Sequence, residues 1–300
     1  MAPTLQFPQG DEVFLDHVAI FVPEFDGSSK VFERLGFLLT PLAVHESALK
    51  PGAPLTPLGT ANRCAMLREG YLEMLGAVSE APMGQHIRRR LARYPGLHLI
   101  ALSACEPERW HRRLSEKGLN PDPVARIQRS TPTPSGPQLI RGTIVRPPVD
   151  SWPEARVQMV FHETPEIMWP EAYLDHANGA EAVTALLIVA DDVAATIDRF
   201  SRMTGRAASG TKTRQRIALD RGSLLVVDAE EAGRLLPGLA VPTLPFFAAV
   251  AIRSDTRVSA AHFARAGVPY TETVNGLQVN AAHGLGATLV FHETGSLWDG

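Results

Sequence analysis

The chain has 300 residues, of which 45% are hydrophobic and 20% are charged, and its formal net charge is -3. This balance excludes a disordered or fibrous chain, and it offers no basic surplus for nucleic acid, since the basic run at residues 88–93 is short enough to be one solvated helix face. The two cysteines, Cys64 and Cys105, exclude a disulfide framework and a multi-cysteine metal cluster.

The first residues and the apolar stretches indicate where the protein works. Residues 1–12 lack the basic and apolar regions of a secretory signal. The longest apolar stretch, at residues 182–190, is too short to span a bilayer. We therefore expect a cytoplasmic protein without membrane contact, whose partner is a small molecule and which pairs as a homodimer if it follows the commonest assembly.

A fourfold internal repeat runs along the chain. Each unit begins with a short apolar strand, passes a polar turn into a stretch with apolar residues at helical spacing, and stops at a Gly. The units open at Leu15, Gly96, Ala182 and Phe246. Their β-rich closing segments are CAMLREGYLEML, VQMVFHET, GSLLVVDA and ATLVFHET.

The repeat predicts an α+β fold of four βαβββ-like modules that pair into two domains with curled mixed sheets. The modules lie at about residues 13–78, 96–166, 182–229 and 246–294. The domains are expected at residues 1–172 and 180–300. The polar segment between them ends in a turn signal, Asn178-Gly179.

Polar side chains interrupt three apolar strands of the first domain. His17 and His98 occupy equivalent positions in the opening strands of the first two modules, and Glu73 lies within a closing strand. A buried imidazole or carboxylate needs a hydrogen-bond partner, a charge or a metal. These side chains are therefore candidate metal ligands, and the alternative is that the histidines are core residues bonded to backbone carbonyls.

The closing strand of the second module offers a fourth ligand. His162 and Glu163 are adjacent, so they point to opposite faces of the sheet and only one faces a cavity. His162 shares its face with Gln158 and Val160, and this more polar face favours His162, with Glu163 as the alternative. Two His, one Glu and this residue form a nitrogen and oxygen site suited to a divalent first-row metal.

Three further residues are candidates for substrate binding. Asn62 and Arg63 enter the strand that leads to Glu73, where an amide and a planar guanidinium are able to hydrogen-bond an oxygenated ligand. The alternative is a surface turn with an ordinary salt bridge. Trp169, with His45, is expected at the mouth of the pocket, and the alternative for each is simple packing.

The second domain lacks most of these residues. The positions equivalent to His17 and His98 fall at about Ala185 and Ala249, and Val226 and Val227 stand where the first module has Glu73. Neither Ala nor Val binds a metal. The C-terminal domain is therefore predicted to be a degenerate, structural copy.

The sequence LDHVAIFVPEFDGSSKVFERLGF, followed by GTANRCAMLREGYLEML and GLHLIALSA, resembles the glyoxalase-like branch of the vicinal oxygen chelate superfamily. The resemblance implies paired βαβββ modules around a cavity, and one divalent metal held by a His on the first strand and a Glu on the last strand of each module. His17, Glu73 and His98 match that pattern, while His162 or Glu163 stands at a fourth position that departs from it.

The resemblance implies a metal-dependent enzyme of isomerase, lyase or dioxygenase type that acts on a small metabolite with vicinal oxygens. The metal is Zn, Ni, Mn or Fe, and Glu73 and His162 are the expected catalytic residues. The alternative function is a metal-free protein that binds or sequesters a small molecule, as bleomycin-resistance proteins do.

Overall fold

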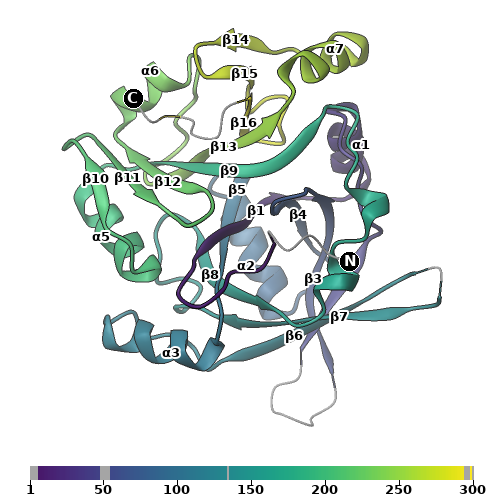
Figure 1. Cartoon of the computed structure of the whole chain (residues 1–300), viewed down its shortest axis with the longest axis vertical. Helices are drawn as coiled ribbons and strands as arrows, with labels where there is room; N and C mark the ends of the chain where they lie inside the picture. Colours follow the sequence, from purple (N-terminus) through teal and green to yellow (C-terminus); the bar gives the residue numbers. More distant parts are fainter. Residues whose placement is uncertain (1–5, 48–54, 134, 294–297, 299–300) are drawn as a thin grey trace.

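A computed structural model gives the architecture of the chain and describes residues 6–47, 55–133, 135–293 and 298. In this described part, two β-structures lie against each other and helices surround them (Figure 1). The α+β class with two units of mixed sheet, predicted from the repeat, is confirmed.

The first two repeats form a closed barrel. Around the barrel the strands are β1 (Phe14–Val22), β4 (Tyr71–Ala77), β3 (Thr56–Met66), β2 (Ala43–Ser47), β6 (Ala125–Thr131), β7 (Gln138–Val145), β8 (Arg156–His162) and β5 (Gly96–Ser103). The pair between β2 and β6 closes the ring, because Glu46 pairs with Gln128 and Ser47 with Ile127. Barrel closure leaves an interior that all of these strands line.

The last two repeats form a second sheet with the same order of equivalent strands. In that order they are β10 (Ala208–Gly210), β11 (Arg214–Ala218), β12 (Ser223–Val227), β9 (Ala180–Val189), β13 (Phe246–Ser254), β16 (Thr288–His292), β15 (Gly276–Val279) and β14 (Thr271–Thr273). Among the described residues β10 and β14 do not pair, so this sheet stays open.

The helices follow the opening strands or close the ends of the barrel. They are α1 (Asp26–Arg34), α2 (Pro82–Leu91), α3 (Pro107–Glu116), α4 (Pro165–Met168), α5 (Val193–Thr204), α6 (Ala229–Leu235) and α7 (Thr256–Ala266), with the 3₁₀ turn η2 (Glu171–Tyr173). Side chains of Asp192 and Asp255 cap α5 and α7, and Gly205 and Gly267 end these helices in the left-handed conformation. Within the described residues, none of the helices is long and apolar enough to cross a membrane.

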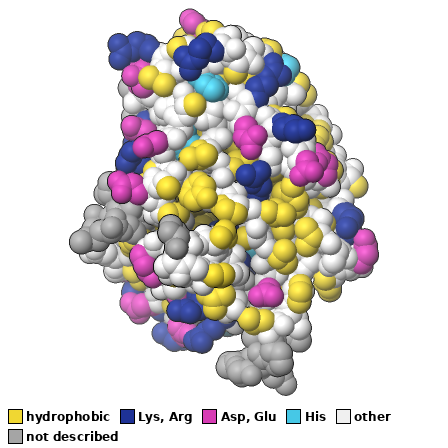
Figure 2. All heavy atoms as spheres, turned by 90° about the vertical axis from the view of Figure 1, so that its right-hand side faces the viewer, with side chains coloured by type: hydrophobic (Ala, Val, Ile, Leu, Met, Phe, Trp, Pro, Cys, Tyr) yellow, Lys and Arg dark blue, Asp and Glu magenta, His cyan; other side chains and the backbone are white. Residues whose placement is uncertain are grey.

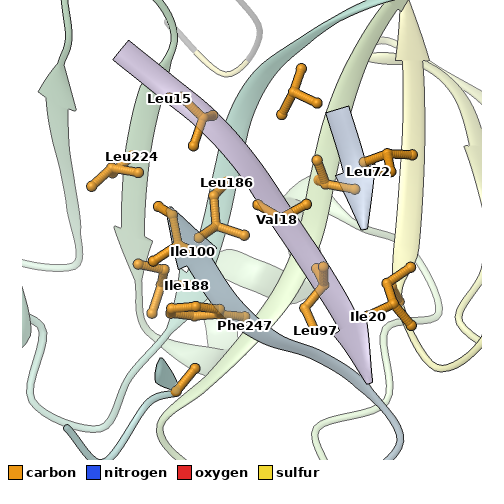
Figure 3. Packing of buried hydrophobic residues seen from close by; sticks show 14 of the residues in the cluster. Leu15, Val18, Ile20, Leu72, Leu97, Ile100, Leu186, Ile188, Leu224 and Phe247 are labelled. Carbon is orange, nitrogen blue, oxygen red and sulfur yellow. The ribbon is translucent and has the colours of Figure 1, made fainter. Parts of the chain in front are cut away.

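The main hydrophobic core lies between the barrel and the second sheet (Figure 3). Val18 and Ile20 of β1 point out of the barrel into this core, which also holds Leu186 and Ile188 of β9. The alternate side chains of β1 face the barrel interior, so both faces of the strand are buried and its sequence is apolar almost throughout. The few polar side chains of β1 therefore need a reason to be there.

The second sheet is filled where the barrel is hollow. Its inner face, which includes Ala185 and Leu225, packs against Leu236 at the end of α6 and against Trp298. These apolar side chains leave no polar ligand set among the described residues of this face.

Figure 2 shows the face of the molecule that lies on the right of Figure 1. Hydrophobic side chains gather in the middle of this face, and Lys and Arg side chains alternate with Asp and Glu around them. This face carries no continuous basic area of the kind that nucleic acid needs.

Candidate active site

A cavity of about 130 Å³ lies inside the barrel, and side chains from all eight barrel strands line it. One end is closed by α2, whose Ile87 packs on Phe21 and Leu75, and Met168 of α4 lines the cavity near the other end. A small chamber with polar groups on an otherwise apolar wall is typical of a small-molecule site.

The strand β1 carries a bulge that brings a carboxylate against His17 and His162, two residues that line this chamber. Leu15 pairs with Leu102 and His17 pairs with Ala101, so Asp16 is one residue too many for the partner strand β5. Without the bulge, Asp16 and His17 would point to opposite faces. With it, the fully buried Asp16 side chain reaches both His17 and His162.

Asp16, His17 and His162 form a continuous hydrogen-bonded group. His17 Nδ1 lies 2.6 Å from Asp16 Oδ1, and His162 Nε2 lies 3.0 Å from Asp16 Oδ2. Burial alone would raise the pKa of Asp16, but the charge and hydrogen bonds of His162 and His17 outweigh burial and hold this pKa well below its ordinary value. Asp16 is therefore a carboxylate at neutral pH.

Gly70 supports the bulge from the neighbouring turn, which gives a testable prediction. A Cβ atom on Gly70 would lie 2.4 Å from the Asp16 carbonyl oxygen, at a backbone φ of +77°. We expect Gly70→Ala to lower the free energy of unfolding by about 3 kcal/mol, from backbone strain plus the steric clash. Urea unfolding measures this change.

A matched control separates strain from the clash at Gly70. Gly118 has a similar φ of +72°, and a Cβ atom there meets nothing within 4 Å. Gly118→Ala is expected to cost only the left-handed penalty of about 1 kcal/mol. Equal losses in both variants would show that the bulge does not depend on Gly70.

Glu73 enters the cavity from β4 in a second polar group. Asn62 Nδ2 donates to Glu73 Oε1 at 2.5 Å, and Arg129 donates to Asn62 Oδ1 at 3.0 Å. Burial would raise the pKa of Glu73, but the charges of His17, His45 and Arg129 and the Asn62 hydrogen bond outweigh burial and lower it. Glu73 Oε2 lies 3.7 Å from His17 Nε2, so the two polar groups meet at that imidazole edge.

Tyr71 and His45 complete the neighbourhood of Glu73. The Tyr71 hydroxyl lies 3.4 Å from His17 Nε2, and burial, with the charges of Asp16 and Glu73, raises the pKa of Tyr71 well above its ordinary value. Tyr71 therefore remains a phenol that donates. Burial lowers the pKa of His45 to about 4, so His45 is neutral at pH 7, with its Nε2 4.0 Å from Glu73 Oε1.

The structure separates His98 from His17. The β5 strand has its own bulge, because Ala19 pairs with Leu99 while Ile20 pairs with Leu97, which leaves His98 unpaired. His98 does not line the cavity, and its Nε2 donates to the Tyr94 carbonyl oxygen at 2.7 Å.

The two bulges define which residues of the first two modules are equivalent. Asp16 and His98 are the bulged residues, so the residue equivalent to His17 is Leu99. By the same register Glu73, which pairs with Ala19, corresponds to Gln158, which pairs with Ala101. The second module therefore places Leu99 and Gln158 where the first places His17 and Glu73.

The second domain follows the same register. Ala185 takes the position of His17, as the repeat predicted. The position of Glu73 falls on Leu225, which pairs with Leu187, and not on Val226 or Val227 as the sequence suggested. His292 bonds Thr184 at 2.7 Å, away from any such set.

The remaining predicted residues divide between the cavity and its surroundings. His162 lines the cavity, whereas the Glu163 carboxylate accepts a hydrogen bond from Thr143 outside it. Asn62 lines the cavity, but Arg63 points away and donates to Thr40 and Ser29. Trp169 is buried behind the site, with its ring centroid 4.8 Å from that of His162.

The predicted metal ligands do not converge. His17 and Glu73 meet, but His98 lies outside the cavity and His162 is directed at Asp16. Among the described residues, no three or more His, Cys, Asp or Glu side chains are arranged to hold a metal ion. Because divalent metals in such sites take at least three protein ligands, the side chains do not fit the centre that the resemblance implied.

Sequence reasoning missed three residues of the site: Arg156 and Gln158, which line the cavity, and Asp16, which contacts the lining residues His17 and His162. Arg156 and Gln158 share a face of β8 with His162, so polar residues at alternate positions of that strand were the available signal. Asp16 had no such signal, because only the bulge turns its side chain toward the histidines.

Comparisons with known proteins agree with this architecture. The model of the family described as "Glyoxalase-like domain" matches residues 15–204, which confirms the resemblance inferred from the sequence. No protein of the curated set matches the chain.

Solved structures with similar folds cover most of the chain. A hypothetical protein from Staphylococcus aureus has a TM-score of 0.61 at 12% identity, with 94% of this chain and 100% of that chain covered. A variant of 4-hydroxymandelate synthase from Streptomyces coelicolor has a TM-score of 0.50 at 12% identity, with 87% and 77% covered. At this identity the likeness concerns the fold alone, and the first match shows that the whole two-part arrangement recurs.

Proposed function

Because the chain belongs to the glyoxalase-like domain family, we propose that it is an enzyme that moves a proton on a small metabolite with two adjacent oxygen atoms. The observation that carries this proposal is the Asp16–His17 pair, which aims an imidazole nitrogen into the barrel cavity beside Glu73 and Tyr71. Of the reactions that the resemblance implies, isomerisation fits this set, since it needs no oxidant and conserves the substrate's atoms.

His17 is the proposed base. Its Nδ1–H donates to the Asp16 carboxylate, which leaves the lone pair on Nε2 directed at the cavity. That nitrogen takes a proton from a carbon next to a substrate carbonyl, and Asp16 stabilises the imidazolium that forms. His162 is a positioning residue, because it holds Asp16 from the opposite side.

The remaining polar groups stabilise the enolate intermediate of this reaction. Removal of the proton leaves an enolate, whose oxygen is stabilised by the Tyr71 hydroxyl as a donor. The ionised Glu73 accepts a hydrogen bond from a hydroxyl on the adjacent carbon. His17 then returns its proton to the former carbonyl carbon, while Glu73 carries the hydroxyl proton to the enolate oxygen, so the carbonyl and the hydroxyl exchange places and every proton is accounted for.

Hydrogen exchange with solvent tests the proposed base. The panel in D₂O comprises 2-oxobutyrate and hydroxyacetone, which each carry two adjacent oxygens and an exchangeable C–H. Proton NMR measures loss of that signal. We expect the wild type to accelerate exchange and His17→Ala to reduce the rate by about 100-fold to 10,000-fold, the usual contribution of a general base.

His283→Ala is the matched control, since His283 is an exposed histidine remote from the cavity, and it is expected to exchange like the wild type. Exchange that is unchanged in His17→Ala would refute the assignment of the base. Binding of both compounds without any exchange would refute the proposed enzymatic function and support the alternative, a protein that sequesters a small molecule.

Metal content tests whether the reaction runs without a divalent ion. Since only His17 and Glu73 of the predicted ligands meet, we expect plasma mass spectrometry of protein purified without a metal-affinity tag to find well below one equivalent of Zn, Ni, Mn or Fe. One equivalent in the wild type that disappears in Glu73→Gln would show instead that His17, Glu73 and the nearby His45 hold a metal.

A further inference from the structure

Arg156 presents a positive charge to the cavity without a partner. Its side chain lines the cavity from β8 and the residue is only 9% exposed. Within the described part of the chain, its Nε has no hydrogen-bond partner and the guanidinium makes no ion pair within 4.0 Å. A buried cation is costly unless something pairs with it, so a free one in a binding cavity indicates an absent anion.

The neighbouring amide is also unsatisfied. Gln158 lies two residues along β8 on the same face, lines the cavity and is 4% exposed, and its Oε1 has no hydrogen-bond partner among the described residues. Arg156 and Gln158 together offer a forked donor and an acceptor about 7 Å apart along the strand. This pair matches a carboxylate with a hydroxyl nearby.

The other charged side chains that line the cavity determine how much negative charge a bound ligand would need to carry. Arg129 is engaged with Asn62 and Met168, and Arg146 lies 3.7 Å from Asp122. Arg141 is exposed. Glu73 is the acidic side chain among the lining residues. Arg129 and Arg156 are thus two buried guanidiniums with no ion pair among the described residues, and Glu73 offsets one of them. One positive charge remains, which favours a monocarboxylate over a phosphate dianion.

Arg156 and Glu73 belong to one row of the barrel wall. Glu73 pairs with Ala19, Ala19 with Leu99, and Leu99 with Arg156. Three strand spacings of about 4.8 Å separate the two charged residues, so they leave room for a ligand over Ala19 and Leu99. A molecule held by Arg156 at one end thus reaches Glu73 and His17 at the other.

We propose that the substrate is a small monocarboxylic acid whose carboxylate binds Arg156 bidentately and whose reactive end, with its second oxygen, faces His17. This inference rests on the proposed function for the reactive end, but the anion site stands on Arg156 and Gln158 alone. The planar guanidinium fork matches the two oxygens of a carboxylate. Gln158 accepts from a hydroxyl on the same molecule.

The experiment compares an acid with its neutral isostere. Binding of 2-oxobutyrate and of 2-oxobutyramide is measured by ligand-observed NMR titration for the wild type, Arg156→Met, Arg156→Lys and Arg68→Met. Arg68 is exposed and remote from the cavity, so its variant controls for the loss of one positive charge. Arg156→Met is expected to weaken acid binding by about 10-fold to 100-fold and leave amide binding unchanged, with Arg156→Lys between.

Thermal unfolding of the ligand-free protein supplies a second readout. Removal of an unpaired buried charge relieves its desolvation, so Arg156→Met is expected to unfold about 2–6 °C above the wild type. A midpoint below the wild type together with an unchanged preference for the acid would overturn the anion site and make Arg156 a structural residue.

The exchange assay distinguishes failure of this inference from failure of the proposed function. His17-dependent exchange on hydroxyacetone without any preference for the acid would refute the carboxylate site and leave His17 as the base. Acid binding that depends on Arg156, with no exchange on either compound, would refute the proposed proton transfer and support the anion site at Arg156.

Discussion

Asp16→Asn is expected to reduce the proton-exchange rate by about 1,000-fold to 10,000-fold, the loss seen when the carboxylate behind a catalytic imidazole becomes an amide. The amide NH₂ donates to His17 Nδ1 where the carboxylate accepted, so the imidazole carries its proton on Nε2 and no longer presents a lone pair to the cavity. Deuterium incorporation into 2-oxobutyrate and hydroxyacetone measures the loss.

The same variant changes how stability depends on pH. Because the folded-state pKa of Asp16 lies below its ordinary value, the carboxylate contributes stability above the ordinary carboxyl range and loses that contribution as pH falls through acid. At pH 7, the free energy of unfolding of Asp16→Asn is expected to be about 1–3 kcal/mol lower than that of the wild type. Urea unfolding should show this gap begin to shrink at about pH 4, where the unfolded carboxyl titrates, and keep shrinking as pH falls further toward the lower folded-state pKa.

Asp175→Asn supplies the control for Asp16→Asn, since Asp175 is an exposed carboxylate paired only with Arg68 on the surface. It is expected to leave exchange unchanged and to shift stability by less than about 0.5 kcal/mol. An Asp16→Asn protein that folds normally and exchanges at the wild-type rate would show that His17 works without the carboxylate.

The fold was predictable because its signal is periodic. Each module repeats one hydrophobic pattern, and four copies of a pattern support one another even where a single strand is ambiguous. The strands β1 and β5 were recognised as buried because apolar residues occupy both of their faces. The closure of the first sheet through Glu46 and Ser47 of β2 was not predictable. No sequence pattern distinguishes these residues from the equivalent strand of the second sheet, which stays open.

The candidate site was predictable only in part, because a strand bulge shifts every later residue by one. The sequences DHVAIFV and LHLIALS align His17 with His98, which is the natural reading when strands are regular. The structure instead bulges at Asp16 and at His98, so His98 corresponds to Asp16. Glu73 and His162 needed no such correction, since strict alternation along their strands already placed them on the inner face.

The charge balance of the cavity wall could not be predicted from the sequence. Arg156 and Gln158 alternate with apolar residues on β8, so the sequence placed them on the face of His162 without showing that no carboxylate of the described residues lies within ion-pair distance of Arg156. The absence of a partner is a property of the assembled barrel. The pKa of Arg156, lowered by burial and by Arg146 to about 9, expresses that deficit.

Two substitutions are expected to create a metal site in the barrel, where no three His, Cys, Asp or Glu side chains of the described residues are arranged to hold an ion. Leu99→His with Gln158→Glu supplies a second imidazole and a second carboxylate at the positions equivalent to His17 and Glu73. The four side chains then point into one chamber with the nitrogen and oxygen donors that Zn and Ni accept. We expect the double variant to bind about one equivalent of Zn with micromolar or tighter affinity, measured by calorimetry and plasma mass spectrometry.

Gln158→Glu alone is the decisive comparison for this design. If His98 were the partner of His17, the single substitution would complete two His and two Glu and would suffice to bind metal. Because His98 donates to the Tyr94 carbonyl oxygen outside the cavity, the single variant is expected to bind no better than the wild type. Circular dichroism of both variants checks that the buried polar groups have not unfolded the barrel. Tight Zn binding by the single variant would place His98 in the site and contradict the equivalence of His17 with Leu99 that the paired bulges define.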